Sequence, residues 1–350
     1  MRLRALAMVG LAGVTACAPA IKQIDVFSLN TVPEEGGTRF TMITSAEDLV
    51  SGPEVTRSLA GGLVVQPNRY FDLTPDGKLI GFLSKKNEKQ NVFVKSTQGG
   101  VASTQRTFRD EVWDPAFSSD GKRIAFVDTR NARTNVFEVG ATQGSAIRQV
   151  TNFDQESHLP AYSPQGGKLA FVQLERSEAA TTANRGTSRQ APGPSTQITR
   201  SYVWEVDLEK NAFTQLAEGS RPVFSPDGKH IAITRNSRDH GNSEIWLIDL
   251  ESGTETVVAT SKDQGFVQPA FSPDGKRIVY AGGTRGEKTR PANWDVYVVD
   301  VDGSNLTQLT FHPGHDLMPR FSPDGAAVYF MSQRGSIEQR WNVWRMEFAR

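Results

Sequence analysis

The sequence has almost no cysteine, no long apolar run and no excess of charge, and each absence excludes a class of protein. Cys17 is the only cysteine among 350 residues, so no disulfide can form within the chain. No stretch of about 18 apolar residues occurs, which excludes a membrane-spanning helix in the mature protein. Lysine and arginine total 39, as do aspartate and glutamate, so the charge does not point to nucleic acid. The composition still provides enough apolar residues for a sizeable core.

The first 16 residues read as a signal peptide rather than as part of the fold. Arg2 and Arg4 precede an apolar run from Ala5 to Val14, and Val-Thr-Ala stands directly before Cys17. This junction resembles the bacterial lipobox, which implies cleavage before Cys17 and attachment of lipid to its sulfur. The alternative is an ordinary secretory signal with an incidental cysteine. Cleavage leaves 37 basic against 39 acidic residues, and Ala18, where Asp would favour the inner membrane, favours the outer membrane.

A phrase of the form Phe-Ser-Pro-Asp-Gly-Lys recurs six times and is the main signal in the chain. Its aromatic residues are Phe71, Phe117, Tyr162, Phe224, Phe271 and Phe321. They are spaced 46, 45, 62, 47 and 50 residues apart, which is the period of a propeller blade with one insertion. Proline presets φ, aspartate suits the next position and glycine can take a positive φ, so each phrase predicts a hairpin turn.

Apolar residues alternate after each turn, which predicts short strands. Third strands are predicted at Asn91–Lys95, Asn135–Val139, Tyr202–Leu208, Glu244–Leu250, Asp295–Val301 and Asn342–Phe348. A fourth strand follows in five units, so each unit is a four-stranded antiparallel blade. The sixth unit reaches Arg350 without one, whereas Glu54–Leu59 has the spacing of a fourth strand with no blade of its own. We therefore predict that Glu54–Leu59 completes blade six and closes the ring.

These repeats resemble the WD-like repeats of TolB propellers over about residues 54 to 350. The resemblance implies an all-β, six-bladed propeller of four-stranded antiparallel blades, closed by an N-terminal strand. The expected organisation is a lipoprotein signal peptide at residues 1–16, a lipidated tether at 17–53 and the propeller at 54–350. TolB itself carries an α/β domain before its propeller, and residues 18–52 are too few for one, so contacts made through that domain cannot be transferred. Within the tether, Ser45 and the acidic residues after it look like a helix start.

The sequence predicts no catalytic residue, cofactor or metal centre. Hydrolase relatives of such propellers carry a serine nucleophile, but no Gly-x-Ser-x-Gly motif occurs here. Oligogalacturonate lyases use histidines and a divalent metal, yet only His158, His312 and His315 precede innermost strands. The residues three places before each aromatic should line the channel: Asn68, Asp114, Leu159, Arg221, Gln268 and Met318. Asp114, His158 and Asp316 are the candidates for a channel-mouth ligand or cation site, with solvated loop residues as the alternative.

The charged residues are unevenly distributed over one face of the predicted propeller. Loops between the second and third strands sum to +9, whereas the links between blades on the same face lean acidic. This predicts a basic outer ring around a more acidic mouth, which could attract an acidic partner or could simply consist of solvated turns. The candidates for partner-binding loops are Arg176, Arg185, Arg189, Arg200, Arg285, Lys288 and Arg290. The first four lie in Leu174–Arg200, which we expect to be a mobile loop because it has few large apolar residues.

Together these features predict a non-catalytic, monomeric lipoprotein of the bacterial cell envelope. We expect it on the periplasmic side, at the outer rather than the inner membrane, acting as a protein-interaction scaffold through the propeller faces. The likeness to TolB implies a Tol-Pal-like envelope process with a peptidoglycan-associated lipoprotein as partner. The alternative function is a small-ligand or cation binder at the channel mouth, or a polysaccharide lyase.

Overall fold

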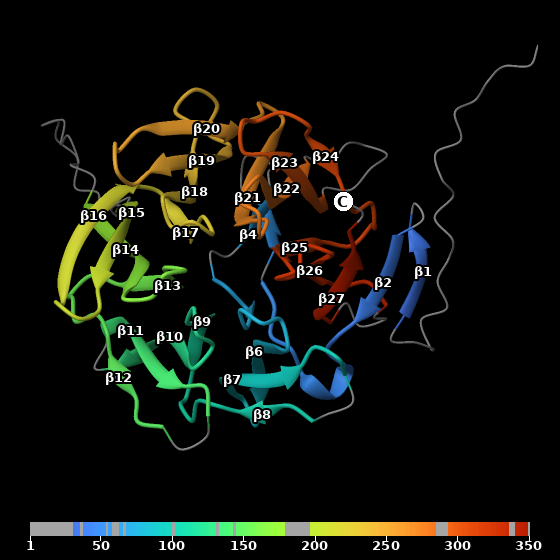
Figure 1. The fold of residues 1–350 in the computed structure, drawn as a ribbon, viewed down its shortest axis with the longest axis horizontal. Coiled ribbons are helices and arrows are strands. Elements are labelled where there is room, and N and C mark those ends of the chain that lie inside the picture. The colour runs from blue at the N-terminus through green and yellow to red at the C-terminus, as the bar shows by residue number, and fades with distance from the viewer. Residues whose placement is uncertain are drawn as a thin grey trace, which may run out of the picture.

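The structure, a computed structural model, describes residues 31–35, 38–53, 55–57, 63–65, 68–99, 102–130, 133–142, 145–178, 197–284, 293–335 and 340–348. In this part of the chain six antiparallel sheets surround a central axis, which confirms the predicted all-β, six-bladed propeller (Figure 1). The predicted signal peptide and Cys17 lie outside the described residues. No described helix is long and apolar enough to cross a membrane.

Each blade runs from an innermost to an outermost strand. Blade one contains β5 (Phe71–Leu73), β6 (Leu79–Lys86), β7 (Lys89–Ser96) and β8 (Thr104–Gln105). Blade two contains β9 (Val112–Phe117), β10 (Arg123–Arg130), β11 (Arg133–Gly140) and β12 (Arg148–Gln149). Blade three contains β13 (Ser157–Tyr162), β14 (Lys168–Glu178), β15 (Gln197–Asp207) and β16 (Ala212–Glu218).

The remaining blades follow the same plan. Blade four contains β17 (Ser220–Phe224), β18 (His230–Asn236), β19 (Ser243–Asp249) and β20 (Glu255–Ala259). Blade five contains β21 (Gln264–Phe271), β22 (Arg277–Thr284), β23 (Asn293–Asp300) and β24 (Thr307–Gln308). Blade six contains β25 (Asp316–Phe321), β26 (Ala327–Ser332), β27 (Asn342–Glu347) and two N-terminal strands, β2 (Thr38–Met42) and β1 (Thr31–Glu35). The third strands therefore form where the repeats predict them.

The repeated phrase forms the hairpin turn between the first two strands of each blade. In blade two, the Gly121 amide donates to the Ser118 carbonyl at 2.8 Å, and Gly121 has a φ of 68°, which glycine adopts without strain. Asp120 accepts hydrogen bonds from the Ser118 hydroxyl at 2.6 Å and the Lys122 amide at 3.0 Å. These two bonds hold the pKa of Asp120 below its ordinary value. The recurring aspartates thus belong to the architecture of the turns.

Apolar side chains fill the interfaces between neighbouring blades. At the interface of blades four and five, for example, Ile245 and Val258 meet Ile278 and Tyr280 in one buried cluster. Comparable clusters lie between blades two and three, three and four, and five and six. The ring is therefore held by contacts between sheets, and its first and last blades need a partner as much as the others do.

An N-terminal strand does close the ring, but it is β2 and not Glu54–Leu59 as predicted from spacing. Strand β2 pairs antiparallel with β27, with Phe40 opposite Met346, and lies on its outer side (Figure 1). Phe40 is fully buried, packs edge-on against Phe330 at 6.1 Å between ring centroids, and lies under the Arg334 guanidinium. Residues 55–57 form β3 (Val55–Arg57), which instead pairs with β4 (Leu63–Val65). The prediction failed because it assumed that the closing strand lies as close to the next innermost strand as in the other blades, whereas β2 ends at Met42 and β5 begins at Phe71.

The long link after β2 ties blade six to blade one. Its Ile43 amide donates to the Val343 carbonyl at 2.8 Å in blade six, and its Ser51 amide donates to Leu83 at 2.9 Å in blade one. Val50 pairs with Ser84, in the place that the start of the innermost strand occupies in blade two. Between these contacts lies the short helix η1 (Ala46–Asp48), capped by Ser45 as the sequence suggests.

A mostly buried ion pair fixes this link, with Asp48 and Lys95 at 2.7 Å. Burial alone would raise the pKa of Asp48, but Lys95 and the Ser45 amide outweigh it and lower the pKa below its ordinary value. The pair therefore contributes stability above the unfolded pKa of an aspartate, and this contribution is lost as the pH falls through the lowered pKa.

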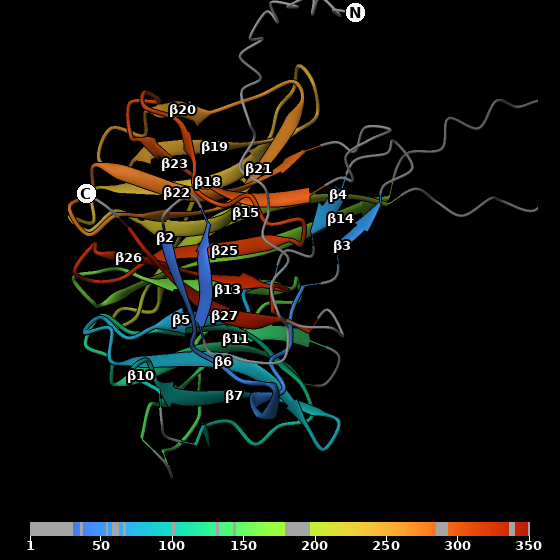
Figure 2. The ribbon, with the colours of Figure 1, turned by 90° about the vertical axis from the view of Figure 1, so that its right-hand side faces the viewer.

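The insertion in blade three is partly strand where a loop was expected. Strands β14 and β15 are paired up to Glu178 opposite Gln197, so both ends of the expected loop Leu174–Arg200 belong to the sheet. The ends of β14, β3 and β4 lie on the same side of the ring (Figure 2). The expected mobility of the remaining residues, 179–196, concerns a segment outside the described residues.

Replacing Phe40 with alanine should lower the free energy of unfolding by about 3–5 kcal/mol, because it leaves a cavity at the closure of the ring. The matched change Val55→Ala in β3 should cost about 1 kcal/mol or less, because that side chain is only half-buried. Urea denaturation of the two variants measures the difference. An equal or larger loss for Val55→Ala would contradict the role of β2.

Candidate functional site

The innermost strands share an unusual backbone position that points side chains at the channel. Three residues before the repeat aromatic, blades two to six carry Asp114, Leu159, Arg221, Gln268 and Met318, with φ values of 56°, 53°, 55°, 60° and 56°. This left-handed conformation is rare for residues other than glycine, and a shift in strand register accompanies it in each of these blades. Four of these residues line the central pocket together with Asn68 of blade one, as the alignment of repeats predicts.

Side chains at this position also link one blade to the next. The Asp114 carboxylate accepts the Leu159 amide at 3.0 Å, and the Gln268 side-chain oxygen accepts the Met318 amide at 2.9 Å. The second Asp114 oxygen accepts the Arg69 amide at 2.5 Å. The other five blades have proline where blade one has Arg69, so only blade one can donate an amide there. The two oxygens of the fully buried Asp114 thus join blade two to the backbones of blades one and three.

Asp114 also faces His158. The two side chains approach to 3.8 Å, and the Nε2 atom of His158 lies 3.2 Å from Glu156. Burial alone would lower the pKa of His158, but the two carboxylates outweigh it and raise the pKa above its ordinary value. Both oxygens of Asp114 already accept backbone amides, so this carboxylate makes a poor cation ligand.

Asp316, the third residue of the predicted channel-mouth site, does not join the other two. It is fully buried in blade six and pairs with the Nη2 atom of Arg334 at 2.6 Å. The guanidinium of Arg334 in turn lies over Phe40 and Phe330. Among the described residues, no three or more His, Cys, Asp or Glu side chains are grouped so that they could hold a metal ion. Arg334 carries no signal in the sequence, because its contact with Asp316 forms only in the folded protein.

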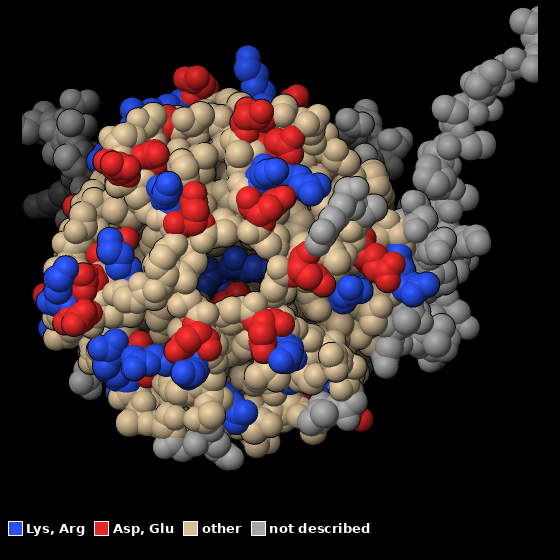
Figure 3. All heavy atoms as spheres, in the orientation of Figure 1, with Lys and Arg blue, Asp and Glu red and all other residues tan. Residues whose placement is uncertain are grey.

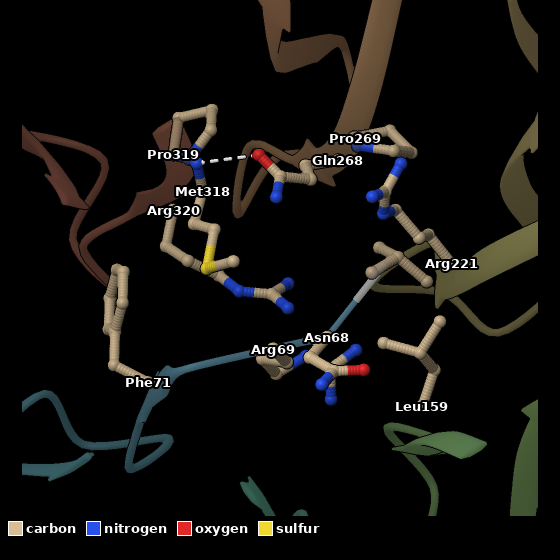
Figure 4. Close-up of a pocket in the computed structure, with 11 residues that line it drawn as sticks. Asn68, Arg69, Phe71, Leu159, Arg221, Gln268, Pro269, Met318, Pro319 and Arg320 are labelled. Carbon is tan, nitrogen blue, oxygen red and sulfur yellow. Dashed lines mark hydrogen bonds between the residues drawn. The ribbon is translucent and has the colours of Figure 1, made fainter. Parts of the chain in front are cut away.

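The sequence argument also missed an arginine cluster in the channel. Arg69, Arg221 and Arg320 line the central pocket from blades one, four and six (Figure 4). Burial and the charge of Arg320 lower the pKa of Arg69 to about 10, and burial lowers that of Arg221 to about 10. A signal was present, since Arg69 replaces the proline of the repeat. Arg320 likewise stands where most other blades have Ala or Val.

Two basic loops of the described residues form ion pairs with acidic links between blades. Lys89 of a loop pairs with Asp110 of a link at 2.7 Å, and Arg133 pairs with Asp154 at 2.8 Å. Part of the predicted basic outer ring is therefore paired with acidic residues of the links. Such exposed pairs contribute little stability but reduce the field available for steering a partner.

The candidates for partner-binding loops are mostly beyond what the structure describes. Arg185, Arg189, Arg285, Lys288 and Arg290 lie outside the described residues. Arg176 belongs to β14 opposite Thr199, and Arg200 is exposed on β15 opposite Glu175. A hydrogen bond with Tyr202 raises the pKa of Arg200 further.

A second hollow lies where the N-terminal link meets blades one, two and six. It measures about 590 Å³ and is lined by Tyr70, Trp113 and Trp341, with Glu111 and Arg340 also on its walls. Tyr70 and Trp113 pack edge-on, with ring centroids 6.2 Å apart. We call this hollow the aromatic groove.

Comparison with known proteins agrees with this geometry. A family model described as the TolB beta propeller domain matches residues 209–348. The chain is a TolB-like β-propeller. Among solved structures, TolB from Acinetobacter baumannii is 19% identical with a TM-score of 0.56, covering 79% of this chain and 65% of that one. A TolB candidate from Agrobacterium tumefaciens is 18% identical with a TM-score of 0.55, covering 85% and 97%.

The fold is also that of an enzyme. Oligogalacturonate lyase from Vibrio parahaemolyticus is 13% identical with a TM-score of 0.54, covering 90% of the TolB-like chain and 95% of the lyase. Identities this low establish the shared fold alone, and one fold can host unrelated activities.

Curated relatives match only in part. An uncharacterised protein of Agrobacterium fabrum is 34% identical over 34% of the TolB-like chain and 38% of its own length. An uncharacterised peptidase of Bacillus subtilis is 25% identical over 63% of the chain and 29% of its own length. A TolB homologue of Chlorobium chlorochromatii is 30% identical over 32% and 23%. The TolB-like chain therefore spans well under half the length of each relative.

Replacing Asp114 with asparagine should lower the pKa of His158, because it removes the fully buried one of the two negative charges beside the imidazole. His158 contributes stability below its unfolded pKa, and this is lost as the pH rises through its raised folded pKa. An NMR titration of the imidazole Cε1 proton measures the change, with the exposed-link variant Asp154→Asn as control. An unchanged pKa in Asp114→Asn would contradict the coupling.

Proposed function

We propose that this TolB-like propeller is a non-catalytic protein-interaction module of the bacterial cell envelope. The aromatic groove is the observation that carries the proposal. Its walls combine Tyr70, Trp113, Trp341 and Arg340, and tryptophan, tyrosine and arginine are the residue types that contribute most to protein–protein binding. The TolB names of the similar structures and of one relative support the same role.

The proposed location follows from the N-terminal sequence. A lipid on Cys17 would hold the propeller at a membrane, since acyl chains are what keep such a body at a bilayer. We place it on the periplasmic side, at the outer membrane, as a monomer. A peptidoglycan-associated lipoprotein is the proposed partner, by likeness to TolB.

A polysaccharide lyase or other small-ligand binder is the second candidate. The observation that favours it is the fold shared with oligogalacturonate lyase. Against a metal-dependent lyase, three arginines line the central pocket, and their positive charges repel a cation.

Crosslinking in intact cells followed by capture of the tagged propeller tests the function. We expect an envelope protein in the wild-type capture and several-fold less of it with Trp341→Ala, because hot-spot aromatic residues cost at least about 2 kcal/mol when truncated. Leu306→Ala is the matched control, since Leu306 is exposed but lies away from the groove.

Two further variants complete this experiment. Cys17→Ser should move the chain out of the membrane fraction, which tests the anchor separately from binding. A short Gly-Ser turn in place of residues 179–196 keeps the last strand pair, Glu178 and Gln197, and shows whether the insertion takes part in binding. Equal capture by wild type and Trp341→Ala would contradict a role for the aromatic groove, and capture of no envelope protein would contradict the proposed function.

A further inference from the structure

The central channel carries an excess of positive charge that the blade architecture does not require. Arg69, Arg221 and Arg320 all line one pocket, although the repeat supplies proline or small apolar residues at two of these positions. Viewed onto the face that carries the Pro-Asp-Gly turns, the channel is an open hole with basic side chains in its depth (Figure 3).

Nearby carboxylates offset this charge only in part. Asp114 is occupied by two backbone amides, and Asp72 accepts the Phe117 amide at 2.9 Å. Asp72 also lies 3.7 Å from the Nε atom of Arg320, which is longer than a hydrogen bond. Among the described side chains the three positive charges thus exceed the two negative charges, although the guanidinium groups have contacts of their own, such as that of Arg69 with the Pro160 carbonyl at 2.5 Å.

A buried donor without an acceptor marks the same pocket. Gln268 is 8% exposed, and its oxygen is committed to the Met318 amide. Its Nε2 atom has no hydrogen-bond partner among the described residues and points into the pocket (Figure 4). A buried amide donor without an acceptor is costly, so an acceptor supplied by a ligand would be favourable here.

The size and walls of the pocket limit the ligand. The central cavity measures about 30 Å³, within about 350 Å³ of empty space that includes the open mouth. A cavity of this size holds only about two water molecules, so the site takes one small group. Phe71, Leu159, Val223 and Met318 supply apolar surface beside the donors, which suits a group attached to carbon rather than an inorganic anion.

We propose that the channel binds a single carboxylate group of an organic acid, with the Gln268 amide and Arg320 as donors and the charge of Arg221 beside them. Guanidinium groups form strong, paired hydrogen bonds to carboxylates. The carboxylate belongs either to a free small acid or to an acidic side chain of a protein. Only the second source rests on the proposed function.

Isothermal titration calorimetry of the intact mature protein tests this site with three probes: glutarate, an acetylated and amidated triglutamate peptide, and inorganic phosphate. We expect Arg221→Gln to weaken carboxylate binding by about tenfold or more. Gln268→Glu should abolish it, because this change keeps an oxygen for the Met318 amide but replaces the donor with a negative charge. Lys210→Gln removes one exposed positive charge of blade three and should change binding less than twofold.

The relative affinities of the three probes distinguish the two sources of the carboxylate. Tighter binding of glutarate assigns the site to a free acid, and tighter binding of the peptide assigns it to a protein side chain. Tighter binding of phosphate than of either, no carboxylate binding at millimolar concentration, or equal weakening by Lys210→Gln would overturn the proposal. Thermal unfolding confirms that the variants fold, with Arg320→Gln as a replacement if Arg221→Gln does not. Because partner capture is tested through Trp341, the failure of one proposal leaves the other standing.

Discussion

The pairing of β2 with β27 is the contact on which the rest of the ring depends. A propeller has no central core, and each blade is buried only by its two neighbours, so an open seam would expose the apolar faces of blades one and six together. The chain closes that seam with Phe40, which fills the outer side of blade six. The link after β2 then connects blade six to blade one, because Val50 pairs with Ser84 and Asp48 forms an ion pair with Lys95.

Inside the ring, a second constraint shapes the channel. Five innermost strands take a left-handed residue at the same place, and the side chains there either hold the next blade or face the pocket. Asp114 and Gln268 do the first, at the cost of using their acceptor oxygens. The polar groups that line the pocket are the three guanidinium groups, Asn68 and the Gln268 amide, whose nitrogen has no acceptor among the described residues. The way in which the blades are joined thus sets part of the polarity of the channel.

Much of the fold could be predicted because it depends on local patterns. The turn around Asp120 and the third strands follow from residues a few positions apart, and the channel position of Gln268 follows from counting back from an aromatic. The closing strand could not be found by counting, because Thr38–Met42 lies outside the repeat and its link is longer than those between the other blades.

The candidate site was harder to predict because it depends on contacts between blades. Asp316 looked available for a ligand, but Arg334 occupies it through a contact that no spacing reveals. Arg69 and Arg320 are not residue types of a metal site, but both depart from the repeat pattern. Departures from a repeat were thus a better guide to the channel than the residue types of known metal sites.

Hydrogen–deuterium exchange of the mature chain and of a chain beginning at residue 54 tests the closure most directly. In the shortened chain we expect faster exchange of amides in β27 and around Ser84 of β6, because both lose their pairing with the N-terminal segment. Blades three and four, on the far side of the ring, should keep their protection (Figure 1). Unchanged protection of β27 and β6 would contradict the claim that the N-terminal segment holds the ring closed.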